Sequence, residues 1–200
     1  MTSARFTVLQ DERLAAVRPV VAERMKEAAR TYGQGAFGEF FDHAMTAMLT
    51  EGLGRAGADE GTLWLLDESR DHLVPRFNSG PNAASFVGSF RQSLRSGMIS
   101  MVVAMEQPIC ENEVHRNQQQ DPTLDRQLGV RTSAMLAVPF YFVGELRGVI
   151  SAVQLRASAD EIEPPGFTPE NLRNLQLTAA VLTRLIEFQL MSFAFGLEDS

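Results

Sequence analysis

The sequence predicts an α/β (α+β) fold, in which an antiparallel sheet has helices packed on one face. Residues 133–142 and 146–155 are two apolar, β-rich runs joined by a glycine-containing turn, a pattern typical of an antiparallel hairpin. Residues 11–32 and 36–54 carry apolar side chains at three- and four-residue spacing, which indicates amphipathic helices. A strand hairpin between helical segments therefore predicts a mixed domain with one sheet.

The N-terminal half alternates helices and short strands. In the first helix, over residues 11–32, Pro19 either kinks the helix or marks its true start, since proline is tolerated only in the first helical turn. A second helix follows directly after a glycine-rich break. The other expected elements are strands over 62–66, 72–77 and 108–110 and a short helix over 98–105.

Two capping signals place helices in the C-terminal half. Asp121 followed by Pro122 predicts a short helix with the aspartate as N-cap and the proline at the first helical position. Thr168 and Pro169 repeat the same arrangement and open the long closing helix. The strand hairpin lies between these two helices.

Composition narrows the possible functions. The 200 residues fit one domain, and a net charge of −7 argues against a nucleic-acid surface, which needs a basic face. Apolar stretches fall short of the ~20 residues that span a bilayer, so no membrane partner is expected, and no signal peptide is visible. The single cysteine, Cys110, excludes an intramolecular disulfide and is consistent with a cytoplasmic protein. The three histidines are far apart, so no metal site is predicted.

The segment 121–155 resembles the C-terminal half of a GAF domain. The matching residues are Asp121, Pro122, Asp125, Ser133, Met135, Leu136, Val138, Pro139, Gly144, Glu145, Gly148 and Val149. The resemblance implies a GAF domain over residues 36–192, including the closing helix from about 168, with residues 1–35 as an N-terminal helical extension. It also implies a ligand pocket on the sheet face opposite the helices.

The resemblance implies a pocket walled by residues 86–101 and 113–120. Arg116 is the expected contact for a small, partly anionic ligand, because its guanidinium offers a planar fork of donors. The alternative is that the apolar residues belong to the core and that His115 and Arg116 are exposed to solvent. The candidate ligand-binding residues are Phe77, Phe86, Phe90, Met98, Met101, His115, Arg116 and Met135.

Three ligand classes or activities of the family fit this sequence poorly. The signature of cyclic-nucleotide-binding members keeps only Phe167, which we interpret as a core anchor, while Leu155 and Leu172 replace charged positions. Cys110 is followed by glutamate rather than histidine, so we expect a buried cysteine rather than a bilin anchor. Reduction of free methionine sulfoxide needs several cysteines for thiol–disulfide cycling, and this chain has one.

The closing helix is apolar on more than one side, so one side needs a partner beyond the sheet. GAF sensors often dimerise through this helix and the one that enters the domain, which predicts a homodimer. The alternative is an intramolecular cover by the N-terminal helix alone. The expected interface residues are Val17, Val21, Met25, Leu185, Phe188, Met191 and Phe195.

The predicted function is a non-catalytic, small-molecule-binding sensory or regulatory GAF domain that acts in signal transduction as a homodimer. No catalytic constellation stands out in the sequence, so no enzyme activity is expected, and no cofactor is identified. The expected partners are an unknown small molecule, a second copy of the chain and a separate effector protein. The alternative is a dimerising protein-interaction module with a vestigial, unoccupied pocket.

Overall fold

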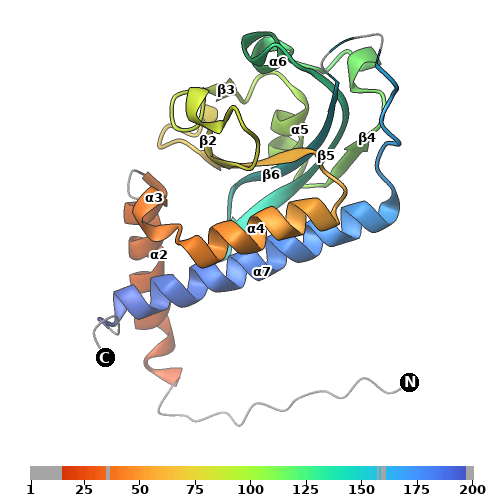
Figure 1. The fold of residues 1–200 in the computed structure, drawn as a ribbon. Coiled ribbons are helices and arrows are strands. Elements are labelled where there is room, and N and C mark those ends of the chain that lie inside the picture. The colour runs from red at the N-terminus through yellow and green to blue at the C-terminus, as the bar shows by residue number, and fades with distance from the viewer. Residues whose placement is uncertain (1–14, 35–36, 157, 159–160, 197–200) are drawn as a thin grey trace.

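The computed structural model describes residues 15–34, 37–156, 158 and 161–196. Within them a single antiparallel sheet is flanked by helices (Figure 1), which confirms the predicted fold class. The strands are β1 (Glu60–Leu66), β2 (His72–Asn78), β3 (Gln92–Ser93), β4 (Ile109–Glu111), β5 (Arg131–Phe142) and β6 (Glu145–Arg156). The helices are α2 (Arg18–Gln34), α3 (Phe37–Phe40), α4 (His43–Arg55), α5 (Met98–Met105), α6 (Thr123–Leu128) and α7 (Pro169–Ala194), with 3₁₀ turns at Ala83–Ser85 and Val114–Arg116.

The sheet order is β3-β2-β1-β6-β5-β4, so the first and last hairpins of the domain meet at its centre. β1 and β6 join them, and Thr62 pairs with Ser151 while Leu63 pairs with Ile150. Side chains alternate between the two faces of a strand. This register therefore sends the two hydroxyl residues to one face and the two aliphatic residues to the other.

The β5–β6 hairpin predicted from sequence is present. Val143 and Gly144 form its turn, with φ angles of 53° and 72°. Two successive residues with positive φ match the twist of a hairpin, as in a type I′ turn. The turn explains why a glycine follows Val143, since glycine adopts positive φ without steric cost.

The two faces of the sheet have different covers. The long helices α4 and α7 lie side by side on one face (Figure 1) and enclose the main core, which includes Leu49, Leu136, Ile150 and Leu182. A smaller apolar cluster, in which Trp64 contacts α5, lies on the opposite face. The prediction of helices on one face holds for the long helices, while the short α5 packs on the other.

The helix α7 begins where the sequence predicted. Thr168 caps it by accepting a hydrogen bond from the Asn171 amide, and the Asn171 side chain accepts one from the Thr168 amide in return. Phe167 is buried in the main core just before the cap, as expected for a core anchor. By length and composition alone α7 could cross a membrane, but one of its faces is part of the main core.

The N-terminal helices differ from the prediction in two places. The first helix starts at Arg18, so Pro19 marks its beginning, and residues 11–14 of the expected helix lie outside the described residues. The single helix expected over 36–54 is wrong, because Asp42 interrupts it: the Asp42 side chain accepts a hydrogen bond from the Met45 amide at 2.8 Å and caps α4. The expected boundary between residues 35 and 36 also lies outside the described residues.

Helix α6 begins one residue later than predicted. Its first residue is Thr123, and Pro122 occupies the cap position without a side-chain hydrogen bond to the helix. The Asp121 carboxylate still accepts a hydrogen bond from the Thr123 amide at 3.1 Å. The aspartate therefore satisfies the first amide of the helix from one position further upstream than an N-cap.

A substitution at Gly148 tests how closely the central strands β1 and β6 pack. A Cβ atom at this position would lie 1.8 Å from the Trp64 carbonyl oxygen, which is fixed in β1. We expect Gly148→Ala to lower the free energy of unfolding by at least about 2 kcal/mol, because neither strand can move without breaking the ladder. Urea denaturation followed by circular dichroism measures the change.

Gly54→Ala is the matched control. Gly54 lies in α4, and a Cβ atom there would meet nothing within 4 Å. Alanine should raise the free energy of unfolding by about 0.5–1 kcal/mol, because it reduces the freedom of the unfolded chain. Equal effects of the two substitutions would contradict the packing of β1 against β6.

Candidate ligand-binding site

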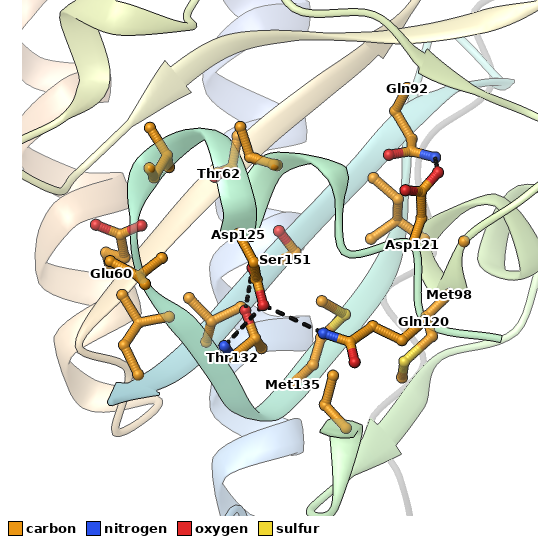
Figure 2. Close-up of a pocket in the computed structure, with 18 of the residues that line it drawn as sticks. Glu60, Thr62, Gln92, Met98, Gln120, Asp121, Asp125, Thr132, Met135 and Ser151 are labelled. Carbon is orange, nitrogen blue, oxygen red and sulfur yellow. Dashed lines mark hydrogen bonds between the residues drawn. The ribbon is translucent and has the colours of Figure 1, made fainter. Parts of the chain in front are cut away.

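A cavity lies on the sheet face opposite α4 and α7. The space that a bound molecule can occupy inside it is about 80 Å³, and its mouth opens to solvent. Strands β1, β5 and β6 form its floor, and α5, α6 and the segment between the 3₁₀ turn at Val114–Arg116 and α6 form its walls (Figure 2).

Two buried hydroxyl groups occupy the floor. Thr62 and Ser151 are paired neighbours on β1 and β6, and both line the cavity. The Asn78 side-chain amide donates a hydrogen bond to Thr62 Oγ1 at 3.0 Å, and the Trp64 indole N–H donates one to Ser151 Oγ at 2.9 Å. Each hydroxyl is thus held in place by a donor, and its own O–H proton is left for another acceptor.

Apolar side chains form most of the walls. Met98 and Ile99 come from α5, Leu124 and Leu128 from α6, and Met135 from β5. Methionine is unbranched and flexible, so such walls adapt to ligands of different shape. The cavity is therefore mainly apolar with a few fixed polar groups, a combination typical of small-molecule sites.

Two aspartates stand at the α6 side of the cavity. Asp125 accepts hydrogen bonds from the Thr132 amide at 2.9 Å, from the Thr132 hydroxyl at 2.8 Å and from Gln120 at 3.2 Å (Figure 2). Asp121 accepts from Thr123 on one oxygen and from Gln92 on the other. These bonds tie α6 to β5 and to the end of β3, and they fix both carboxylates.

The hydrogen bonds change the acidity of Asp121. Those from Thr123, and then from Gln92 and Ser96, hold the pKa of the Asp121 carboxyl below its usual 3.8, although partial burial opposes the shift. Asp121 is therefore ionised at neutral pH.

Glu60 adds a third carboxylate at the other end of the floor in the view of Figure 2. Burial raises the pKa of Glu60 above its usual 4.5, and a hydrogen bond from Asn78 only partly offsets this. Its carboxylate lies against the backbone of Gly80, where a Cβ atom would collide with it.

The structure brings three of the eight predicted ligand-binding residues to the cavity. Phe86, Met98 and Met135 line it. Phe90 and Met101 do not, and Phe90 packs edge-on against Trp64 with ring centroids 6.2 Å apart.

The other three predicted residues lie elsewhere. Phe77 points to the helical side of the sheet, where its ring centroid is 5.8 Å from that of Phe41. Arg116 is exposed and forms an ion pair with Glu113, the residue just before the same short turn. His115 turns toward the segment between β6 and α7, with its Nε2 4.0 Å from Glu163 Oε1. Neither polar residue lines the cavity, because the 3₁₀ turn directs Val114 inward instead.

Sequence reasoning missed the polar residues of the cavity. Thr62 and Ser151 give little signal in the sequence, because apolar residues follow Thr62 and flank Ser151 on both sides. The signal was the period of two: Thr62 and Trp64 alternate with Leu63 and Leu65, so a hydroxyl on that face had to point away from the helical core. Asp121 and Asp125 match a helix start and the family pattern in the sequence, and neither pattern indicates that their side chains line a cavity.

The prediction that Cys110 is buried is wrong, because Cys110 is exposed. The reason is that β4 is an edge strand of three residues, and the Cys110 thiol lies 3.8 Å from the Phe167 carbonyl oxygen. Partial burial nevertheless raises the pKa of the thiol, and the thiol does not line the cavity.

Comparison with known proteins identifies the family. Residues 36–187 match the family described as GAF domain. The chain belongs to the GAF domain family. No protein with a curated description matches the sequence.

Solved structures of GAF domains share the fold. The GAF domain of an Acinetobacter phosphoenolpyruvate-protein phosphotransferase has a TM-score of 0.58 at 16% identity, over 94% of this chain and 99% of that one. The GAF-B domain of DevS from Mycobacterium smegmatis has a TM-score of 0.51 at 18% identity, over 78% and 100%. Free methionine-R-sulfoxide reductase from Neisseria meningitidis, solved with its substrate, has a TM-score of 0.53 at 17% identity, over 94% and 98%. These likenesses show the fold.

Asp121 should make the stability of this GAF domain depend on pH. Its pKa is lower in the folded chain than in the unfolded chain, so its contribution is fully present above about pH 5 and is lost as the pH falls through the folded-state value, below 3.8. Asp121→Asn should lower the free energy of unfolding by on the order of 1 kcal/mol at pH 7 and by less at pH 3.

Urea denaturation of both proteins at pH 3, 5 and 7 measures this difference. Asp71→Asn is the control, since Asp71 is an exposed aspartate in the β1–β2 loop. A destabilisation by Asp121→Asn that stayed constant across this range would contradict the role given to the carboxylate.

Proposed function

We propose that this GAF domain is a non-catalytic sensory or regulatory module that binds a small molecule and acts in signal transduction as a cytoplasmic homodimer. The observation that carries the proposal is the cavity floor, where the buried hydroxyls of Thr62 and Ser151 each accept a hydrogen bond and still have a proton to donate. A buried donor that lacks an acceptor costs free energy. A hydrogen-bond acceptor of the ligand, placed above the floor, would accept hydrogen bonds from these two hydroxyls.

The cavity lining supports binding rather than catalysis. Among the described residues that line it, none is a cysteine, histidine or lysine, the side chains that most often act as nucleophile or base. Two of its carboxylates, Asp121 and Asp125, accept hydrogen bonds on both oxygens. They are suited to fixing structure and charge more than to transferring protons.

Native mass spectrometry of freshly purified protein tests the proposal. We expect a non-covalent complex with a small molecule, because the lining is mainly apolar with a few fixed polar groups. Val153→Phe should abolish the complex, since Val153 lines the cavity and a larger side chain would fill it.

Val20→Phe is the matched control, because the exposed Val20 lies on α2. A complex that survived Val153→Phe, or no complex at any stage, would contradict the proposal.

The dimer rests on a second apolar stripe of α7. Its core face, with Leu175, Leu182 and Ile186, packs on the sheet. On the opposite face, alternating steps of four and three residues define a seam of the kind that pairs helices in coiled coils. The members of this seam are Leu177, Val181, Arg184, Phe188, Met191 and Phe195, and its five apolar members are exposed large side chains.

The predicted interface residues differ in how far they are exposed. Phe188, Met191 and Phe195 belong to the seam, and Val17 is also exposed. Met25 and Leu185 are partly buried against the main core, and Val21 is half-buried. Helix α2 therefore covers part of its own chain, as the intramolecular alternative expected, and the seam remains for a second copy.

Replacing Val181 and Phe188 together with Glu should convert the dimer to a monomer. Charges on facing seams would repel and would lose the apolar burial, which is on the order of 1.5–3 kcal/mol for each large side chain. Light scattering of the unmodified protein at tens of micromolar should give twice the 22.1 kDa of one chain.

Gln176→Glu, on the flank of α7, is the control that should leave the dimer intact. A mass of one chain for the unmodified protein would refute the dimer.

In the proposed signalling, ligand binding changes the geometry of the pair of α7 helices in the dimer. A separate effector protein binds to this helix pair and responds to the change.

A further inference from the structure

The ionisable side chains that line the cavity are all acidic. Glu60, Asp121 and Asp125 line it, and among the described residues of the lining there is no lysine, arginine or histidine. Carboxylates that line a partly closed cavity repel an anion. Arg116, the expected anion contact, is paired with Glu113 outside the cavity. The lining therefore opposes a carboxylate or phosphate on the ligand.

The three carboxylates do not have the same capacity to bind. Both oxygens of Asp121 and of Asp125 already accept hydrogen bonds from neighbouring residues. Glu60 receives one from the side chain of Asn78 and has lone pairs left. Glu60 is therefore the carboxylate best able to accept a hydrogen bond from a bound molecule.

The floor supplies the complementary group. Thr62 is 6% exposed and Ser151 4% exposed, and both hydroxyls face the cavity (Figure 2). Trp64 and Asn78 each donate a hydrogen bond to one of these hydroxyls, and neither hydroxyl donates a hydrogen bond within the part of the chain that the structure describes. Two nine-tenths-buried O–H donors side by side on the floor suit a carbonyl oxygen or a ring nitrogen.

We infer that the ligand is an uncharged or cationic small molecule, mainly apolar, with an N–H or ammonium donor directed at Glu60 and an acceptor over Thr62 and Ser151. The inference rests on the proposed function and names the chemical class of its ligand. Methionine and leucine side chains of α5, α6 and β5 would enclose the apolar part. A bare metal ion does not fit, since no group of three metal-binding side chains occurs among the described residues.

Three one-ring probes of matched size test the inference on the full chain: benzylammonium, benzamide and benzoate. Methyl resonances of Met98 and Met135, both in the lining, report binding in the cavity by nuclear magnetic resonance. We expect benzylammonium and benzamide to shift them at millimolar concentration. Benzoate should bind about tenfold more weakly or worse, because a charge-assisted bond is replaced by repulsion.

Glu60→Gln should reduce the affinity for benzylammonium about tenfold while changing that for benzamide little. Glu68→Gln, an exposed glutamate in the β1–β2 loop, is the matched control and should change neither. Should Glu60→Gln fail to fold by circular dichroism, Thr62→Val provides the second variant. It removes one floor donor and should weaken benzamide, whose carbonyl oxygen would accept from the floor.

The outcomes separate the two proposals. Benzoate binding as tightly as benzylammonium, or a Glu60→Gln protein that keeps the full preference for benzylammonium, would overturn the inference and leave a ligand-binding cavity in place. If no probe moved Met98 or Met135, the cavity would not be a small-molecule site, and the proposed function itself would fail.

Discussion

The register of β1 against β6 is the constraint on which the rest of the structure depends. These strands are about 90 residues apart in sequence, and their pairing sets Thr62 beside Ser151 and Leu63 beside Ile150. A slip of one residue would exchange the two faces of a strand, placing hydroxyls in the helical core and leucines in the cavity. Gly148 helps to hold this register, because only glycine fits against the Trp64 carbonyl group.

The two faces of the sheet then perform different tasks. The face under α4 and α7 is closed by large aliphatic and aromatic side chains and supplies the main core. The opposite face is covered only by short elements, so its polar residues need partners from loops, and the bonds of Asp121 and Asp125 supply them. Strand β6 contributes to both faces of the sheet. Ser151 lines the cavity, while Ile150 and Ala152 pack in the main core on the side of α7. One strand thus separates the proposed ligand from the helix proposed to carry the signal.

The overall fold followed from the sequence because its signals were local. The β5–β6 hairpin has a glycine turn, and α7 has Thr168 and Pro169 at its start, so both could be placed without knowledge of tertiary contacts. The break at Asp42 was missed because the apolar spacing continues across it, and only the capping bond distinguishes two helices from one. Short-range patterns decide an element, whereas its exact ends depend on such single bonds.

The candidate site was predicted less well, since a cavity is assembled from distant segments. Met98 and Met135 were found because apolar residues near the family's pocket segments are easily recognised. His115 and Arg116 were misplaced because sequence shows that a segment is near a pocket but not which way a 3₁₀ turn directs its side chains. The charge of the site differs from the prediction for the same reason: the predicted cation, Arg116, lies outside the cavity, and the carboxylates of Glu60, Asp121 and Asp125 line it.

Trp64 offers the most direct measurement of the central claim, that the β1–β6 face binds a small molecule. It is the single tryptophan of the chain, it lines the cavity, and its indole N–H is bonded to Ser151. Fluorescence of unfolded and refolded protein would be followed while the small-molecule fraction released from freshly purified protein is added back. The account predicts a saturable change in Trp64 emission that is absent in Val153→Phe. An emission spectrum that stayed unchanged on addition of this fraction would contradict it.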